Sequence, residues 1–485
     1  MPIIDLCMEY VNMRAFLLLS TFLLFFTGCQ DRGYGTQKID TIPGIFSTTP
    51  LTILYTTPKN SGDIAQRAYI NIVFSATLDP TTLTAQSVHL KNSSKEIPIE
   101  MTIVNNLLYI KPLESLQDKV TYTLSLNDSI TDFFGNALED SDTFSYHCKQ
   151  NFWKSVEAGK THAMAQSTAG DLYMWGSNLK ETLLVDPILY SVDMPFPIAE
   201  QYKAKDYSAG GHSSTIITET NSLVTTGALK LADTPERVNT ASVGETHAVF
   251  VYDNRTLYSW GSNSRGELGN FGILGGTTLV QEFTKSEDWN SASTGQNFTL
   301  AIKNNGTLWG WGANDDGQLG INLLNERRQP TQEESLSDQW SSVSAGAKHA
   351  LAIQYNGSLW SWGNNASGEL GQGDNQNSRT AKKIGNLTTW KTVSAGANHS
   401  LALDDNGTLW TWGNNQHGQL GLNNTINKNI PVKIDSNLSW VSVSAGNSFS
   451  LGVKSDGTLW AWGYNFYDQL GLGQTDDLLL PTEVK

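Results

Sequence analysis

Five histidines could do acid–base or metal chemistry, because imidazole changes its protonation state near neutral pH and commonly ligates metals. Four of them follow a glycine by three residues, and Phe298 and Phe449 take the same place in two other segments. A position that recurs along the chain and accepts Phe is better explained by packing. No Ser/His/Asp or HExxH arrangement accompanies these histidines, so we predict no catalytic residue and no enzyme. The five are His162, His212, His247, His349 and His399.

Clustered acidic residues could hold a cation such as Ca²⁺, which prefers carboxylate oxygens. None of the clusters has the spacing of an EF-hand loop, and all lie in segments that we expect to be turns. We therefore predict solvated turns, with no metal and no cofactor. The clusters are Asp315–Asp316, Asp404–Asp405, Asp476–Asp477 and the group Asp128, Asp132, Asp140 and Asp142.

Tryptophan pairs separated by one residue could stack on sugar rings. In a strand such pairs lie on one face, because side chains alternate between the two faces. A packed interior between sheets is the simpler interpretation, and sugar stacking stays open only for rings that reach the surface. The pairs are Trp309/Trp311, Trp360/Trp362, Trp410/Trp412 and Trp460/Trp462.

The composition narrows the possible partners. The chain has 485 residues, 15 Trp, 43 Gly and a net charge of −15. An acidic chain without clustered Lys and Arg is a poor ligand for a phosphate backbone, so we expect no nucleic-acid partner. Three cysteines are too few for a disulfide framework.

The N-terminal segment predicts where in the cell the protein is located. Arg14 precedes an apolar run over Ala15–Phe26, which is too short to span a bilayer but suits a secretory signal. Phe26-Thr27-Gly28-Cys29 resembles a bacterial lipobox, which implies that Cys29 is lipidated and anchors the chain in a lipid bilayer. An ordinary secretory signal ending near a cysteine is the alternative.

The predicted signal covers residues 1–28, although Asp5 and Glu9 are unusual there and translation from Met13 would remove them. Residues 29–49 are polar and rich in Gly and Thr, which is typical of a flexible tether. Cys148 would then be the only free thiol, so we expect no intrachain disulfide. The expected location is the bacterial cell envelope, at the outer membrane or cell surface.

Residues 50–148 alternate short apolar runs with turn residues, which predicts a small β-sandwich. The predicted strands are 68–74, 97–104, 107–111, 120–126 and 143–147. The segment resembles the bacterial Ig-like domains of S-layer and surface proteins. The resemblance rests on FSATLDPTTL (Phe74–Leu83), YIKPLESL (Tyr109–Leu116), YTLSL (Tyr122–Leu126) and ITDFFGNAL (Ile130–Leu138). It implies a spacer or adhesion module.

Residues 149–485 contain a repeat built on Leu-Trp-x-Trp-Gly followed by Asn-x-x-Gly-x-Leu-Gly. Each unit offers three strands and a fourth from a Pro-x-x-Val/Ile segment, and Asn-Gly suits a type I′ hairpin between the second and third. Four short strands repeated seven times predict an all-β fold, a seven-bladed β-propeller behind the Ig-like sandwich. The anchors are Trp175, Thr226, Trp260, Trp311, Trp362, Trp412 and Trp462.

Two irregularities bear on how the ring is built. The second unit has Thr226 in place of Trp and a step of only 34 residues to Trp260, which predicts a shortened blade. The chain ends on a surplus segment, Pro481–Val484. We predict that this segment forms the missing strand of the first blade and so closes the ring.

The segment AGANHSLALDDNGTLWTWGNNQHGQLG (Ala395–Gly421) resembles a regulator of chromosome condensation repeat, and all seven units follow it. The family's founding member exchanges nucleotide on the GTPase Ran, but no residue here aligns with its exchange element. A secreted bacterial member that inhibits β-lactamases through one face of its ring is a nearer analogue. The resemblance therefore implies a propeller that binds a protein, including in an inhibitory role.

We accordingly expect a non-enzymatic scaffold that binds an unidentified protein, with a carbohydrate-binding adhesin as the alternative. Once the repeated residues are set aside, the non-repeating segments are the places for a binding site. The stretch 271–288 is one of them, and Phe271, Leu274 and Phe283 are the candidate partner-binding residues.

Overall fold

The computed structural model describes residues 49–484 except 67, 140, 150–151, 185–189, 199–201, 230, 232–236 and 273–274. The predicted signal, the tether up to residue 48, Cys29 and Leu274 lie outside the described residues. The described part is all-β, as predicted, with one short 3₁₀ helix, η2 (Pro80–Thr82). Within it, no helix is both long and apolar enough to cross a membrane.

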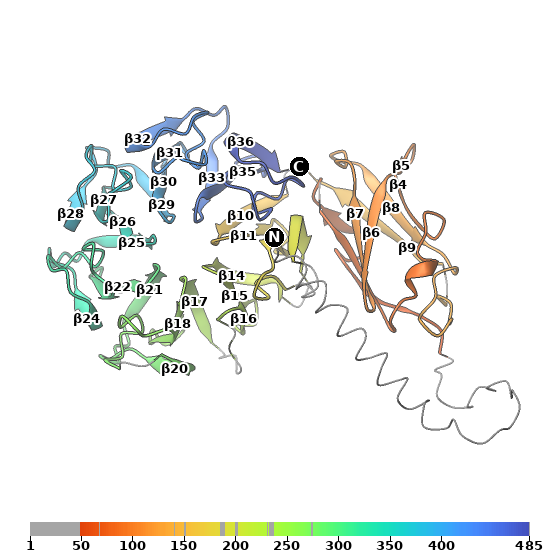
Figure 1. Ribbon diagram of the computed structural model, residues 1–485, viewed down its shortest axis with the longest axis horizontal. Helices are drawn as coiled ribbons and strands as arrows, with labels where there is room; N and C mark the ends of the chain where they lie inside the picture. The colour runs from red at the N-terminus through yellow and green to blue at the C-terminus, as the bar shows by residue number, and fades with distance from the viewer. Residues whose placement is uncertain are drawn as a thin grey trace, which may run out of the picture. The chain divides into compact units, whose positions relative to one another are not determined.

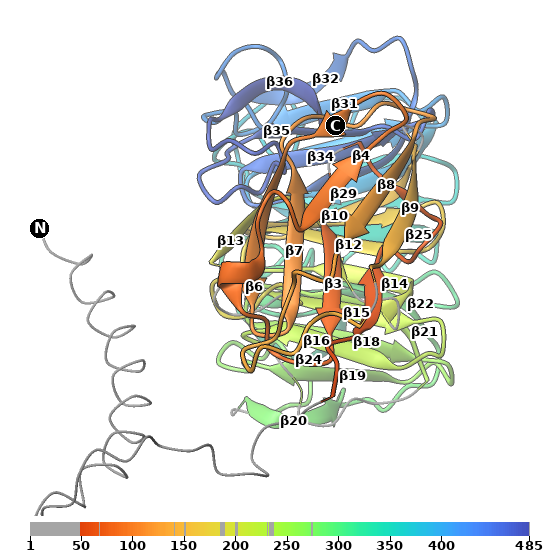
Figure 2. The same ribbon diagram turned by 90° about the vertical axis from the view of Figure 1, so that its right-hand side faces the viewer.

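The first hundred described residues form two sheets that share one apolar core. All five predicted strands are present, within a few residues of the predicted bounds. Figure 2 shows three strands of the first sheet, β3, β6 and β7, side by side. The first sheet contains β1 (Ile53–Thr57), β3 (Ile70–Phe74), β7 (Leu107–Pro112) and β6 (Ile99–Val104), and the second β2 (Gly62–Ile64), β9 (Thr143–Cys148), β8 (Thr121–Leu126), β4 (Val88–Lys91) and β5 (Glu96–Ile97). Cys148 is a buried free thiol.

From Trp153 onward, the described strands form seven antiparallel sheets in chain order. Figure 1 shows them arranged around a common centre, with the first strand of each sheet innermost. The first three sheets are β10 (Trp153–Ala158), β11 (His162–Ser167), β12 (Leu172–Ser177) and β13 (Ser191–Pro197); β14 (Ala204–Ala209), β15 (Ser213–Thr218) and β16 (Leu223–Gly227); and β17 (Val238–Val243), β18 (His247–Tyr252), β19 (Leu257–Gly261) and β20 (Gly276–Gln281).

The next two sheets are β21 (Trp289–Thr294), β22 (Phe298–Lys303), β23 (Leu308–Gly312) and β24 (Arg327–Gln332); and β25 (Trp340–Ala345), β26 (His349–Gln354), β27 (Leu359–Gly363) and β28 (Ser378–Lys383). The last two are β29 (Trp390–Ala395), β30 (His399–Asp404), β31 (Leu409–Gly413) and β32 (Lys428–Ile434); and β33 (Trp440–Ala445), β34 (Phe449–Lys454), β35 (Leu459–Gly463) and β36 (Leu478–Val484). The second sheet has three strands in the described residues, which agrees with the predicted shortening.

The prediction that the C-terminal strand completes the first sheet is wrong. Strand β36 pairs with β35 in the last sheet, and the first sheet has its own fourth strand, β13. Pro195-Phe-Pro-Ile198 at the end of β13 fits the Pro-x-x-Ile pattern in the same register as Pro431–Ile434, so the first unit supplies its own fourth strand and leaves no place for the C-terminal one. The last sheet instead meets the first through β33 and β10, where the Ala158 N–H donates to Ser444 Oγ over 2.9 Å.

The type I′ prediction for the Asn-Gly hairpins is also wrong. In the turn of Lys303–Gly306 the Gly306 N–H donates to Lys303 O over 2.9 Å, and only Gly306 has a positive φ, of 80°. A type I turn followed by a glycine in the left-handed region can connect the same two strands. It needs one residue with a positive φ, whereas a type I′ turn needs two. The Asn305 side chain also stabilises the turn, since its Oδ1 accepts the N–H of Thr307 over 3.1 Å.

Tryptophan joins five of the seven sheets to the preceding one. The second Trp of each pair is fully buried, and its indole N–H donates to a backbone carbonyl of the preceding unit. The acceptors are Glu267 O for Trp311, Gln318 O for Trp362, Glu369 O for Trp412 and Gln419 O for Trp462, over 2.8–2.9 Å. Trp175 makes the same bond to Gln469 O over 3.0 Å, so the last unit also joins the first. The predicted packed interior is therefore confirmed for these rings.

Candidate functional site at the axis of the ring

A circle of glycines surrounds the axis. Each begins the turn that follows the first strand of its sheet, and a Cβ placed on any of them would come within 2.7 Å of the carbonyl oxygen of the next one. The relation runs through all seven and returns from the last to the first, so the innermost turns touch in a closed circle. They are Gly159, Gly210, Gly244, Gly295, Gly346, Gly396 and Gly446.

Hydroxyl groups near the ends of the first strands, two residues before these glycines, connect neighbouring sheets. In six units a serine two residues before the glycine accepts a backbone N–H from the following unit, as Ser344 does from Ala395 over 3.0 Å. In the first unit Glu157 takes this place. Burial, followed by the charge of Asp206, raises the pKa of Glu157 to about 8.

The buried histidines lie between neighbouring sheets. His349 Nε2 is 3.0 Å from Ser400 Oγ of the next unit. That hydroxyl donates its proton over 2.8 Å to Glu369 O, which belongs to the same unit as His349. Nε2 must therefore carry the hydrogen, which leaves Nδ1 as a buried atom without a partner against Gly346. Burial lowers the pKa of His349 to about 3. The ring is a neutral structural group.

The same contact recurs in two chemical forms. Histidine faces a hydroxyl in the pairs His162–Ser214, His247–Thr299, His349–Ser400 and His399–Ser450, over 2.8–3.0 Å. Phenylalanine stands in the histidine position at Phe298 and Phe449, and the residue in the corresponding hydroxyl position is Ala350 or Ala163. The position therefore serves contact between sheets, in agreement with the packing interpretation of the sequence.

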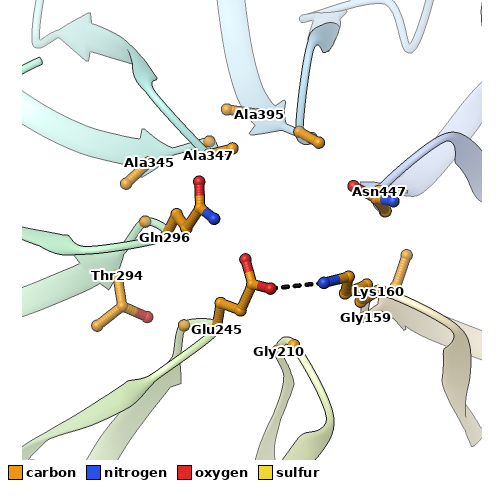
Figure 3. Close-up of a pocket in the computed structure, with 18 of the residues that line it drawn as sticks. Gly159, Lys160, Gly210, Glu245, Thr294, Gln296, Ala345, Ala347, Ala395 and Asn447 are labelled. Atoms are coloured by element: carbon orange, nitrogen blue, oxygen red, sulfur yellow. Dashed lines mark hydrogen bonds and ion pairs between the residues drawn. The ribbon is translucent and has the colours of Figure 1, made fainter. Parts of the chain in front are cut away.

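The residue after each glycine faces the axial opening, which we call the mouth. Figure 3 shows Lys160 and Glu245 reaching toward each other, with Gln296 beside them. Lys160 Nζ lies 2.5 Å from Glu245 Oε1, and the pair passes over Gly211, which has no side chain to obstruct it. The mouth encloses about 110 Å³, and the seven residues are Lys160, Gly211, Glu245, Gln296, Ala347, Ala397 and Asn447.

The mouth is chemically uneven. By the order of the units, charged and amide side chains occupy one part of its circumference, whereas Ala347 and Ala397 occupy two neighbouring units in another part. Sequence reasoning did not select Lys160 or Glu245. The signal was present, since the residue after each glycine varies while the glycine itself recurs, but the pairing of Lys160 with Glu245 depends on the curvature of the ring.

The candidates from the non-repeating loop lie farther out. Phe271 and Phe283 are 62% and 52% exposed, and their ring centroids are 5.4 Å apart. The structure therefore brings these two predicted residues together at the surface, while Leu274 lies outside the described residues. No group of three or more His, Cys, Asp or Glu side chains in the described part is arranged to hold a metal.

A groove also runs between the last two sheets, away from the axis. It encloses about 880 Å³ and is lined by Trp460, Lys454, Leu438 and Leu480, among others. The ring of Trp460 is half-buried, with Lys454 Nζ 3.5 Å from its centroid. The first Trp of each pair thus reaches the surface in part, which the second does not.

Sheets that follow one another around an axis and close on themselves define a β-propeller. The family model for the RCC1-like domain matches residues 228–485, just over half of the chain. The chain therefore belongs to the family of proteins with an RCC1-like domain. A model for the bacterial Ig-like domain matches residues 47–148.

Curated relatives match parts of the chain. The chain is 28% identical to the ultraviolet-B receptor UVR8 of Arabidopsis thaliana over 253 residues, which cover 48% of this chain and 57% of the receptor. It is 35% identical to the human probable E3 ubiquitin-protein ligase HERC6 over 137 residues, 27% of this chain and 13% of that protein. The matched part thus spans little more than half of the first relative and a small fraction of the second.

Solved structures align with this chain at low sequence identity. Human WBSCR16 matches with 19% identity and a TM-score of 0.48, over 72% of this chain and 86% of that chain. Yeast RCC1 (Prp20), solved with Kap60, matches with 20% identity and a TM-score of 0.49, over 69% of this chain and 75% of that chain. Likeness at this level adds nothing to what the family match shows.

Proposed function

We propose that this chain is a non-enzymatic protein-binding scaffold, and that its seven sheets are the blades of a propeller over residues 149–485 that binds a partner through the face carrying the mouth. The observation that carries the proposal is the combination of a repeated backbone with non-repeated side chains at the mouth. The glycine circle sets the geometry of every turn, so Lys160, Glu245, Gln296 and Asn447 are free of a scaffold role.

The size and chemistry of the mouth favour a macromolecule. Small-molecule pockets enclose about 300–1,000 Å³ and bury most of their ligand, whereas the mouth encloses about 110 Å³. Lys160 and Glu245 neutralise each other. The half-buried His212 lies near both, and partial burial followed by the charge of Lys160 lowers its pKa. A broad face with a few polar groups is suited to a protein surface, and an inhibitory role is one use of such a face.

The relatives support a protein-interaction role for the fold. Their names include a receptor and E3 ligases. Because the match covers only 13% and 5% of the two human ligases, ligase activity is not part of the proposal.

The proposed setting is the bacterial cell envelope. Residues 1–28 would be a lipoprotein signal, with Met13 a possible start, acylated Cys29 the bilayer anchor and 29–49 the tether. Residues 50–148 would form an Ig-like β-sandwich that serves as a spacer. The apolar run before Cys29 and the match to a bacterial Ig-like domain support this arrangement.

Carbohydrate binding is the second candidate, and the groove beside Trp460 favours it. Its volume lies in the range of small ligands, and a half-buried indole offers part of one face for stacking on a sugar. Lys454 covers that ring, which makes the groove less open to a sugar than an uncovered indole would be. Quenching of tryptophan fluorescence by envelope glycans, lost in Trp460→Phe, would support this candidate.

The proposal is tested by capture from envelope extract with the mature chain, in which a tag replaces Cys29. The double variant Lys160→Ala/Glu245→Ala carries at the mouth the residue found at 347 and 397, so it should fold normally. We expect one protein to be enriched by the wild type and lost with this variant. Tyr355→Ser, on an exposed hairpin turn at the opposite edge of its sheet, is the matched control and should retain the partner. Equal capture by all three forms would contradict binding at the mouth.

A further inference from the structure

The last unit has an unusual loop between β35 and β36. In the sixth unit this loop reads Asn414-Asn-Gln-His-Gly418, whereas in the seventh it reads Tyr464-Asn-Phe-Tyr-Asp468. Three aromatic side chains thus replace Asn414, Gln416 and His417. Because strands alternate in direction within each sheet, the loop lies on the same face as the mouth.

The aromatic residues do not hold the loop together. Asn465 does so in the seventh unit, since its Oδ1 accepts the N–H of Leu470 over 2.9 Å and its own N–H donates to Asp477 Oδ1 over 3.0 Å. Asn415 makes the same two bonds in the sixth unit, to Leu420 and Asn427, over 2.9 Å each. The two loops share a backbone framework and differ in the side chains around it.

The aromatic side chains gather at the surface. The Phe466 ring is 65% exposed, and its centroid lies 6.5 Å from that of Tyr464 with the planes 15° apart. Tyr467 meets Phe466 edge-on at 5.1 Å, and His417 of the neighbouring sheet lies 4.6 Å from Tyr464. We call Tyr464, Phe466 and Tyr467 the aromatic cluster. Phe466 is exposed and the two tyrosines are half-buried beside it, and an aromatic group that reaches the surface with no role in its own loop indicates an interaction surface.

Carboxylates flank the aromatic cluster. Asp477 lies 2.7 Å from His417 Nδ1, Asp476 is exposed beside it, and Asp468 belongs to the same loop, where it accepts a hydrogen bond from Ser191 over 2.9 Å. Asp468 and Asp476 stand where the sixth unit has Gly418 and Ile426. Aromatic faces attract cations through their quadrupole, and nearby carboxylates strengthen that attraction. The whole chain carries a net charge of −15, which favours a cationic ligand further.

We propose that the aromatic cluster binds an arginine- or lysine-bearing segment of the protein partner, with the cation against the faces of Tyr464 and Phe466 and the carboxylates beside them. The inference rests on the proposed function, because it names a second contact on the same face of the propeller. A basic polypeptide is the proposed ligand because negatively charged carboxylates and aromatic faces occur together at this place. A neutral sugar would use the rings and not the carboxylates.

The test uses a synthetic peptide of alternating Arg and Gly, and a peptide of the same length with citrulline in place of every Arg. The mature full chain is titrated with each labelled peptide, and binding is followed by fluorescence anisotropy. The loop variant Tyr464→Asn/Phe466→Gln/Tyr467→His carries the side chains of the sixth unit, whose framework this chain already folds. We expect it to bind the Arg peptide at least tenfold more weakly than the wild type does.

Two further variants sharpen the result. Asp477→Asn introduces the residue of the sixth unit, Asn427, and should weaken Arg-peptide binding several-fold while keeping the bond from the Asn465 N–H. Gln416→Ala, in the sixth loop, should change nothing. Binding of the citrulline peptide as tightly as the Arg peptide, or equal binding by the wild type and the loop variant, would overturn the inference.

The outcome is separable from that of the proposed function. If the loop variant still captures the envelope partner and the peptides bind equally to both forms, the scaffold role survives and the cationic site does not. If no form captures a partner, the proposed function fails, whereas the peptide titrations still decide whether the aromatic cluster binds cations.

Discussion

The histidine between the fifth and sixth sheets offers a quantitative test of how the propeller is held together. The double variant His349→Phe/Ser400→Ala turns this contact into the pair that the chain already uses at Phe298 and Ala350. We expect it to fold, because the glycine circle and the Trp362 bond to Gln318 O remain.

The expected effect appears in the acid dependence of stability. His349 is fully buried, its Nδ1 has no acceptor, and burial lowers its pKa to about 3. The unfolded chain takes up a proton near pH 6.5, whereas the folded chain does not until about pH 3. The stability that the neutral ring provides is therefore present above pH 6.5 and is lost as the pH falls, at about 1.4 kcal/mol per pH unit. Between pH 7 and pH 5 this loss is about 2 kcal/mol.

The measurement is urea unfolding at pH 7 and pH 5, followed by tryptophan fluorescence. The drop in the free energy of unfolding between the two pH values should be about 2 kcal/mol smaller in the double variant than in the wild type. His147→Gln changes an exposed histidine and should leave the drop unaltered. An identical drop in wild type and double variant would refute the reasoning, because it would mean that His349 is protonated to the same extent in the folded and unfolded chains.

Three further changes test other contacts. Glu157→Ser introduces the serine of the other six units. The folded-state pKa of Glu157 is raised to about 8, so the folded wild type holds a proton that the unfolded chain releases above about pH 4.5. The free energy of unfolding of the wild type should therefore fall between about pH 4.5 and pH 8 by up to about 1.4 kcal/mol per pH unit. Urea unfolding of the variant should lack this slope. Trp340→Phe should lower the free energy of unfolding by about 1.5–3 kcal/mol more than Trp440→Phe does. The reason is that the Trp340 indole N–H donates to the Glu333 carboxylate over 3.2 Å, while Trp440 Nε1 has no partner. Equal losses in urea unfolding would contradict this. Gly346→Ala should cost at least about 3 kcal/mol, read as a fall in the urea midpoint, because its Cβ would lie 2.5 Å from the next glycine's carbonyl oxygen; a near-neutral effect would mean that the circle relaxes easily.

Much of the fold follows from short-range patterns. The Leu-Trp-x-Trp-Gly motif places two indoles on one strand face, and the structure buries the second of each pair between sheets, as at Trp362. Alternation over 107–111 and 120–126 located strands β7 and β8 of the first domain. The recurring His or Phe position was correctly interpreted as packing. Its hydroxyl or methyl partner, such as Ser400, lies in the next unit and was not recognised from sequence.

The errors and omissions involve contacts between distant segments. Strand β36 pairs within its own sheet because the first unit supplies its own fourth strand, β13, which already occupies the edge of the first sheet. Lys160 and Glu245 meet across Gly211 because the ring brings turns of different sheets together.

The sequence by itself therefore determined the strands, the repeat and the family resemblance, since strand period and turn chemistry depend on neighbouring residues. Tertiary structure alone decided how the ring closes, which side chains share the mouth, and that the aromatic cluster of Tyr464, Phe466 and Tyr467 gathers beside His417. The physical reason is that these features depend on sheet curvature and on contacts between units, which no local pattern encodes.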